Sequence, residues 1–146
     1  MKKTICKIAV LLMTLVLSAC LFVGCGGETG KAQAEVLESS STKVVIKINQ
    51  ADENATLISA MDYLKGEGKL QFEKSGDGMI MSINGVQNPA DWSSCWMLYT
   101  SDAQMSNTEW GTTEYNGQTY GSAILGAETL PITAGSIYVF VFESFS

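Results

Sequence analysis

Few side chains in this 146-residue sequence could carry out catalysis. The sequence contains no histidine, which excludes a Ser-His-Asp or Cys-His catalytic arrangement and a histidine-bearing zinc site. General acid–base catalysis would fall to carboxylates, lysines or tyrosines, and the acidic residues are scattered singly, without the paired spacing of a glycosidase. The sequence therefore predicts a protein that is not an enzyme, with no catalytic residue, no cofactor and no metal site.

The residue type best suited to binding is aromatic. Trp96 and Tyr99 belong to a predicted strand, where core packing is the simpler interpretation. The others belong to predicted polar loops, where an aromatic ring can either cover the core or offer a ligand a flat apolar platform with a hydrogen-bonding edge. The candidate ligand-binding residues are Trp92, Trp96, Tyr99, Trp110, Tyr115 and Tyr120.

The N-terminus has the pattern of a secretory signal. Lys2, Lys3 and Lys7 precede a run over residues 8–17 that is apolar except for Thr14, and the sequence turns polar soon after residue 25. This run is too short for a spanning helix and typical of a signal peptide. We expect residues 1–24 to be removed.

Two cysteines at the end of this segment resemble the bacterial lipobox, in which a small residue precedes a cysteine that becomes lipidated. Cleavage before Cys25 would leave a mature start of Cys-Gly-Gly-Glu, whereas cleavage before Cys20 would leave Leu-Phe-Val exposed to water. Cys25 is therefore the predicted lipidation site and Cys20 the alternative; an ordinary signal peptide is the third interpretation. The predicted location is extracytoplasmic, on the outer face of a bacterial cell membrane.

The charge of the chain limits its partners. The full sequence has a net charge of −6, and removal of residues 1–24 takes away three lysines and leaves six lysines against 15 acidic residues, a net charge of −9. Such a chain repels nucleic acid and anionic membrane surfaces. The lipid itself must then provide the membrane attachment. Beyond residue 25 the only cysteine is Cys95, which we interpret as a small buried apolar residue.

Apolar periodicity predicts one helix and several strands within a domain over residues 43–146. Leu57, Ala60, Met61 and Leu64 form the apolar stripe of an amphipathic helix. Alternating or continuous apolar residues predict strands; these lie at residues 44–48, 70–73, 78–83, 95–99 and 136–143.

The remaining segments are predicted to be irregular. Residues 25–42 have little to bury and read as a flexible tether behind the lipid. Residues 101–121 read as a long polar insertion with aromatic residues and an Asn-Gly turn. The strands at 78–83 and 95–99 are expected to be neighbours in the middle of one sheet. The predicted fold is α+β, with one helix packed on a mostly antiparallel sheet of about five strands.

Four segments together resemble a known family. Residues 56–61, 80–86, 96–99 and 135–140 recur in this order in the uncharacterised bacterial domain that is similar to the C-terminal β-domain of transcobalamin and intrinsic factor. The resemblance covers about residues 43–143 and implies a β-grasp-like sheet with one helix across it. In the vitamin carriers this domain closes over cobalamin held against a separate helical barrel, and this chain has no such barrel.

Two functions are expected from these features. The first is a surface-anchored lipoprotein with a solute-binding module, for cobalamin or another corrinoid, that passes its ligand to a transporter or partner. The alternative is an adhesion or assembly module that binds another protein through its aromatic loop. Cobalamin comes only from the family resemblance.

Overall fold

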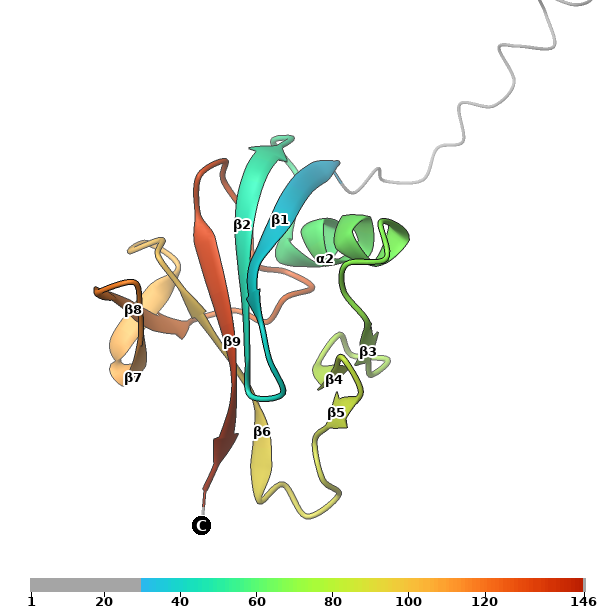
Figure 1. Cartoon of the computed structure of the whole chain (residues 1–146). Helices are drawn as coiled ribbons and strands as arrows, with labels where there is room; N and C mark the ends of the chain where they lie inside the picture. The colour runs from blue at the N-terminus through green and yellow to red at the C-terminus, as the bar shows by residue number, and fades with distance from the viewer. Residues whose placement is uncertain (1–29, 146) are drawn as a thin grey trace, which may run out of the picture.

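The computed structural model describes residues 30–145, which form one helix and nine strands (Figure 1). Six strands form an antiparallel sheet of order β1-β2-β9-β6-β8-β7, and a second sheet has the order β3-β4-β5. Helix α2 and the small sheet lie on one side of the large sheet, and the β7–β8 hairpin lies on the other (Figure 1). The fold class is α+β, as predicted, with more strands than expected. Residues 1–29, including Cys20 and Cys25, lie outside the described part.

The centre of the large sheet is built from the strands whose apolar pattern is strongest. Strand β9 (Ile137–Ser144) lies between β2 (Lys43–Ala51) and β6 (Ser94–Thr100), and all three pair antiparallel. Their alternating side chains point to opposite faces, and both faces are covered. The three predicted strands at residues 44–48, 95–99 and 136–143 are thereby confirmed.

Helix α2 (Leu57–Gly66) buries the predicted stripe, because Leu57, Ala60, Met61 and Leu64 are fully buried. The helix begins at the N-cap Thr56, whose N–H donates to Ser59 Oγ at 3.4 Å. Its buried side packs with one face of the large sheet and with the small sheet in a single large core. A helix of 10 residues has little stability alone, so this packing holds it.

The small sheet corrects the expected pairing of residues 78–83 with 95–99. Strand β4 (Ile80–Ile83) pairs with β3 (Phe72–Lys74) and with β5 (Val86–Gln87), not with β6. The Asn84-Gly85 turn, with φ of 48° and 83°, folds β5 straight back onto β4. A turn this tight lets β5, rather than β6, take the available edge of β4.

The predicted polar insertion is a β-hairpin, so that expectation is wrong for most of residues 101–121. Strand β7 (Ser106–Tyr115) pairs with β8 (Gln118–Ala123) across the Asn116-Gly117 turn, whose φ values are 49° and 75°. Asn-Gly is the pair that this mirror-image turn requires. Its polar residues face water, while a minority of aromatic residues faces the sheet.

Strand β1 (Ala32–Ser39) corrects the predicted tether over residues 25–42. It pairs antiparallel with β2 and buries Ala32 and Ala34 against the helix side of the core. Alanine is small, so the apolar signal of this strand is weak in the sequence even though its position in the sheet is regular. The folded domain therefore begins before residue 43.

Candidate functional site

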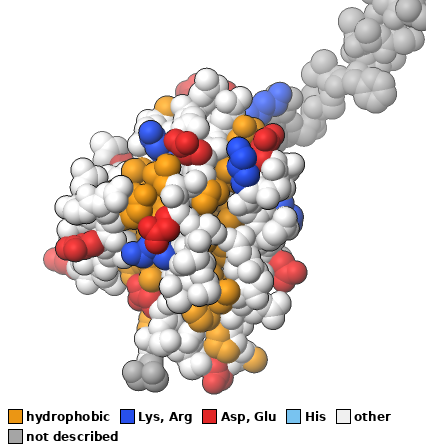
Figure 2. Space-filling model, viewed as in Figure 1, with side chains coloured by type: hydrophobic (Ala, Val, Ile, Leu, Met, Phe, Trp, Pro, Cys, Tyr) orange, Lys and Arg blue, Asp and Glu red, His pale blue; other side chains and the backbone are white. Residues whose placement is uncertain are grey.

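A mainly apolar hollow of the described surface lies between the start of β4 and β6. Its volume is about 130 Å³. The lining residues are mainly apolar and come from both sheets and the segment before residue 130: Gly78, Met79, Ile80, Asn88, Trp92, Cys95, Trp96, Leu98, Gly126, Ala127 and Phe140. We call this hollow the Trp92 pocket. Figure 2 shows apolar atoms reaching the surface at the lower end of the molecule, where Figure 1 places the loop between β5 and β6.

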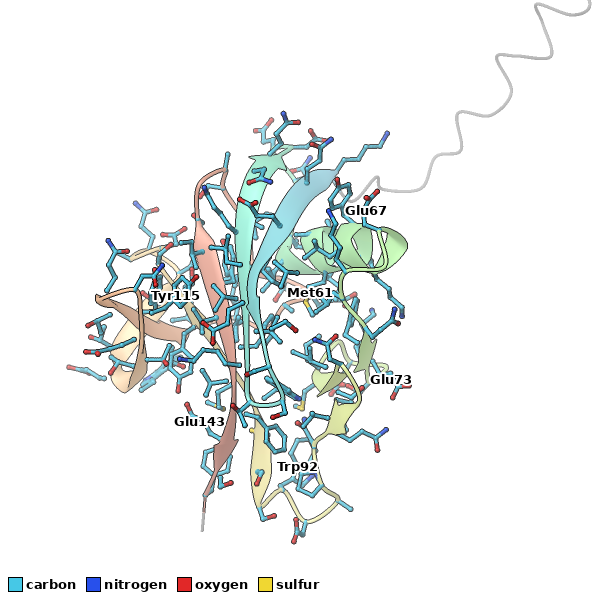
Figure 3. The ribbon with its side chains drawn as sticks, in the orientation of Figure 1. Met61, Glu67, Glu73, Trp92, Tyr115 and Glu143 are labelled. Atoms are coloured by element: carbon cyan, nitrogen blue, oxygen red, sulfur yellow. The ribbon has the colours of Figure 1, made fainter. Side chains whose placement is uncertain are left out.

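Trp92 and Met79 form the exposed rim of the pocket. Trp92 is 47% exposed and Met79 49% exposed, although both are large apolar residues. Trp92 has φ of +56°, a left-handed conformation that is unusual for a bulky residue. Its N–H donates to Pro89 O at 3.0 Å, which closes the turn that holds this conformation. Figure 3 shows Trp92 beside β6, at the end of the molecule away from the start of β1. The backbone thus holds an aromatic ring at the pocket mouth at a conformational cost.

Trp96 has a different role from Trp92, although both line the pocket. It is only 7% exposed, and its indole N–H donates to Val86 O at 2.8 Å. Its ring packs against Phe142, with the ring centroids 5.3 Å apart. The polar edge of Trp96 is therefore already occupied, and this residue contributes a fixed apolar wall rather than a hydrogen bond to a ligand.

Asn88 joins the two sheets beneath the pocket. Its Nδ2 donates to Ile80 O at 3.0 Å, and its Oδ1 accepts from Trp96 N–H at 3.0 Å. One amide side chain thus makes the link between β4 and β6 that backbone hydrogen bonds would make in a continuous sheet. Because only a side chain bridges the strands here, they stay apart and leave room for the pocket.

The turn that carries Met79 is held by the segment before residue 130. Gly78 has φ of +86°, and a Cβ at this position would lie 2.7 Å from Glu128 Cβ, so only glycine fits. Lys74 Nζ donates to Glu128 Oε2 at 2.7 Å on the same side. These two contacts with Glu128 hold the turn, and so keep Met79 at the mouth of the pocket.

The three tyrosines among the predicted residues lie on the opposite face of the large sheet. Tyr99 and Tyr120 are buried with Val45 and Val139 in a small second core, and Tyr115 packs against Tyr120 with centroids 6.4 Å apart. Figure 3 shows Tyr115 on the hairpin, away from Trp92. The structure therefore divides the predicted residues into two groups, and these tyrosines pack the hairpin onto the sheet.

The Tyr99 hydroxyl is engaged inside this second core. It donates a short hydrogen bond to Glu143 Oε1, and a Cβ at Gly111 of β7 would lie 3.5 Å from the hydroxyl. Burial, and next the hydrogen bond to Glu143, raise the pKa of Tyr99 well above its ordinary value. Burial also raises the pKa of the Cys95 thiol, with Glu143 as the second cause. Both groups stay protonated at neutral pH, which does not favour a nucleophilic role.

Trp110 stands apart from both groups. It lies in the irregular part of β7, between Asn107 and Thr112, and is 64% exposed. It has no aromatic partner among the described residues. The sequence suggested one surface with Trp110, Tyr115 and Tyr120. The structure instead places Trp110 apart from the two tyrosines.

A larger and more polar hollow lies between the end of α2 and the small sheet. Its volume is about 540 Å³, and its walls are mainly amide, hydroxyl and charged side chains. The only cation that lines it, Lys65, is already engaged, because its Nζ donates to Phe72 O at 3.3 Å and lies 5.0 Å from the Phe72 ring centroid. We therefore place the candidate site at the Trp92 pocket.

Sequence reasoning found Trp92 and Trp96 but missed the residues that complete the pocket. The sequence pattern predicts Met79 as one position of an alternating strand, and Leu98 and Phe140 as strand core. These residues meet only because two sheets and a loop converge, and no local pattern signals that. The polar loop before residue 94 was the one available signal, since Trp92 there has no strand to pack in.

Two other features are absent from residues 30–145. No group of three or more histidine, cysteine, aspartate or glutamate side chains is placed to hold a metal ion. Within the same residues no helix has the length and apolar character needed to cross a membrane.

Comparison with known proteins gives no match: no protein-family model, curated protein or solved structure matches the chain. The resemblance to the transcobalamin and intrinsic factor domain, carried by residues 56–61, 80–86, 96–99 and 135–140, therefore stays a prediction.

Proposed function

We propose that this chain is a binding module and not an enzyme, that it acts outside the cytoplasm on a lipid anchor, and that the Trp92 pocket is its binding site. The observation that carries the proposal is the left-handed Trp92 at the pocket mouth. Such a conformation disfavours the folded state by about 1–3 kcal/mol and is maintained where the surroundings enforce it, often at functional sites. A tryptophan is also among the residues that most often dominate binding energy.

The chemistry of the pocket fits an apolar group. Its walls supply ring faces, a thioether and aliphatic side chains, and the Trp96 indole N–H is already bonded. An apolar cavity of similar size, about 150 Å³, is large enough to bind benzene. The ligand therefore enters the pocket with a group of about that size, driven by removal of apolar surface from water.

The solute version of this proposal names a corrinoid, which rests on the family resemblance. A corrinoid is far larger than 130 Å³, so it would insert one edge and lie across Trp92 and Met79. On the same family resemblance we propose that the fold is β-grasp-like. The β1–β2 hairpin followed by a helix across the sheet supports it, although β9 runs antiparallel to β2.

A second candidate function is an adhesion or assembly module that binds another protein. The size of the pocket favours it, because sites for whole drug-sized ligands usually measure about 300–1,000 Å³. A pocket of about 130 Å³ instead suits one apolar side chain of a partner. Titration with cobalamin separates the two: saturable heat that is lost in Trp92→Ala supports the solute version, and no heat removes the corrinoid.

The anchoring part of the proposal has its own test. Strand β1, the first described element, starts at the end of the molecule opposite Trp92, so an anchor attached to that end would lie far from the pocket (Figures 1 and 3). Cys25→Ser should release a folded protein into the medium. Release by Cys20→Ser instead would make Cys20 the lipidated residue, and release by neither would contradict the lipoprotein proposal.

The pocket itself is tested with benzene on the full chain, with Cys20 and Cys25 both replaced by serine so that no lipid competes for the probe. Benzene should shift the NMR signals of the Trp92 indole and the Met79 methyl group in a saturable way. The Trp110 indole, on an exposed bulge, is the internal control and should not respond. Equal responses of all indoles, or none, would contradict a specific pocket.

A further inference from the structure

One wall of the Trp92 pocket is an unpaired edge of β6. Strand β6 pairs with β9 along its whole length, but on its other side it pairs with β8 only at Tyr99 and Thr100. After Ser122, the partner of Tyr99, strand β8 no longer pairs with β6 but still pairs with β7. The chain stays beside β7, because Ile124 N–H donates to Met105 O at 3.0 Å. Within the described chain, no strand therefore pairs with this edge from Ser94 to Leu98.

The direction of the backbone groups on β6 follows from its pairing. Phe142 N–H donates to Thr42 O, so the backbone of Phe142 points away from β6, and Trp96↔Phe142 is a pair without mutual hydrogen bonds. The N–H and C=O of Trp96 and Leu98 then point to the free edge. Asn88 Oδ1 accepts the Trp96 N–H. The Leu98 N–H and the Trp96 C=O have no protein partner in residues 30–145.

These two groups lie beside the pocket, because Trp96 and Leu98 both line it. Unpaired strand edges are sites where another extended chain can add by main-chain hydrogen bonds. A single extended residue can accept from Leu98 N–H with its C=O and donate its own N–H to Trp96 C=O. A neighbouring apolar group of the same chain could then fill the 130 Å³ pocket.

We propose that the ligand of the Trp92 pocket is an extended polypeptide segment that adds to the β6 edge at Trp96 and Leu98 and inserts one apolar side chain under Trp92. The proposal rests on the proposed function and names the class of its ligand. Main-chain hydrogen bonds give affinity in this mode, and the pocket selects the side chain.

Charge specifies the segment further. Asp77 and Asp91 are each adjacent in sequence to a residue that lines the pocket, Gly78 and Trp92. Both carboxylates are held as anions: hydrogen bonds from Ser75 lower the pKa of Asp77, and hydrogen bonds from Ser93 lower the pKa of Asp91. The chain is acidic overall. The complementary segment therefore carries lysine or arginine beside its apolar residue.

The experiment uses two peptides with the same side chains. The first is the blocked heptapeptide Lys-Thr-Lys-Leu-Lys-Thr-Lys, and the second is the same peptide with every backbone nitrogen from residue 3 to residue 5 methylated. Methylation removes the donors that the edge requires and leaves charge and composition unchanged. Binding to the full chain, with Cys20 and Cys25 replaced by serine, is followed by NMR, together with exchange of the Leu98 amide proton.

The unmodified peptide should bind, shift the Trp92 indole and slow exchange of the Leu98 amide at least tenfold. The methylated peptide should bind at least tenfold more weakly, which is the loss expected for one or two hydrogen bonds. The double variant Asp77→Asn, Asp91→Asn should bind the unmodified peptide more weakly than wild type. Trp110→Ala should bind it as tightly as wild type.

Four results would overturn the proposal. Equal binding of the two peptides would exclude strand addition. A dimer in which two copies of this chain pair at the β6 edge would show that the occupant of the edge is a second copy and not a peptide. If benzene shifts Trp92 but neither peptide does, the peptide ligand is wrong and the proposed pocket stands. If benzene and both peptides leave Trp92 unchanged, the proposed function itself fails.

Discussion

The two faces of the large sheet are covered in different ways. On one face, α2, β1 and the small sheet bury a large continuous core, and the junction of the two sheets leaves the Trp92 pocket open. On the other face, the β7–β8 hairpin buries only four residues and closes over a tyrosine cluster. Both faces are rich in aromatic residues, so aromatic content does not identify the site. What distinguishes the candidate site is a half-exposed tryptophan in a disfavoured backbone conformation.

The helix side should carry most of the stability. Leu57→Ala removes a fully buried side chain where the helix meets the sheet, and should lower the free energy of unfolding by about 2–5 kcal/mol. Chemical denaturation measures the change. Leu37→Ala, at an exposed strand position, is the matched control and should change it by less than about 0.5 kcal/mol. Equal midpoints for the two variants would contradict the packing described for α2.

The hairpin side should contribute less, but measurably. Tyr120 is 2% exposed, and Tyr120→Ala should lower the free energy of unfolding by about 2–3 kcal/mol, since the hairpin can partly close the cavity. Tyr120→Phe is the control, because it keeps the ring and loses only the 3.3 Å hydrogen bond to Gln118. A Tyr120→Ala midpoint at the wild-type value would mean that the tyrosine cluster does not hold the hairpin.

The hairpin side should also respond to alkaline pH. Burial and Glu143 raise the pKa of Tyr99 above its ordinary 10.0, so the folded state holds this proton more tightly than the unfolded state. The free energy of unfolding must then fall as the pH rises above about 10. Tyr99→Phe should weaken that fall and lower stability at pH 7 by about 1 kcal/mol.

Denaturation of wild type and Tyr99→Phe at pH 7 and near pH 11 measures this difference. Some alkaline loss should persist in the variant, because burial also raises the pKa of Tyr120 and of Tyr138. Identical pH dependence in the two proteins would show that the Tyr99–Glu143 contact does not affect ionisation.

The smallest effect is expected at Trp110. Trp110→Ala removes a side chain that is 64% exposed and should change the free energy of unfolding by less than about 0.5 kcal/mol. It should also leave benzene binding unchanged. Loss of binding in this variant, measured by the same NMR titration, would move the site to the hairpin.

The sequence predicted the elements whose apolar pattern is strong. The helix stripe at Leu57, Ala60, Met61 and Leu64 and the strand over residues 136–143 are found where periodicity placed them. Strand β1 was missed because it buries alanines, which carry little hydrophobic signal. The hairpin was missed because its strands are mostly polar, although Asn116-Gly117 is a strong hairpin signal when the flanking residues are read as strands.

The strand pairing and the pocket were not predictable from the sequence, for a different reason. Periodicity shows which residues form a strand, but it does not show which strands become neighbours. Residues 78–83 and 95–99 were both recognised as strands, yet the Asn84-Gly85 turn and the Asn88 side chain keep them in separate sheets. The pocket exists because of that separation, so it follows from the tertiary arrangement rather than from any local motif.

Whether Trp92 is held in place for binding is decided by the variant Trp92→Gly. Glycine adopts the left-handed conformation without the cost of about 1–2 kcal/mol that other residues have, and this gain offsets its greater flexibility when unfolded and the lost ring contacts. We expect a free energy of unfolding within about 1 kcal/mol of wild type, together with loss of saturable benzene binding. A fall of several kcal/mol with binding retained would show that Trp92 covers the core and is not part of a binding site.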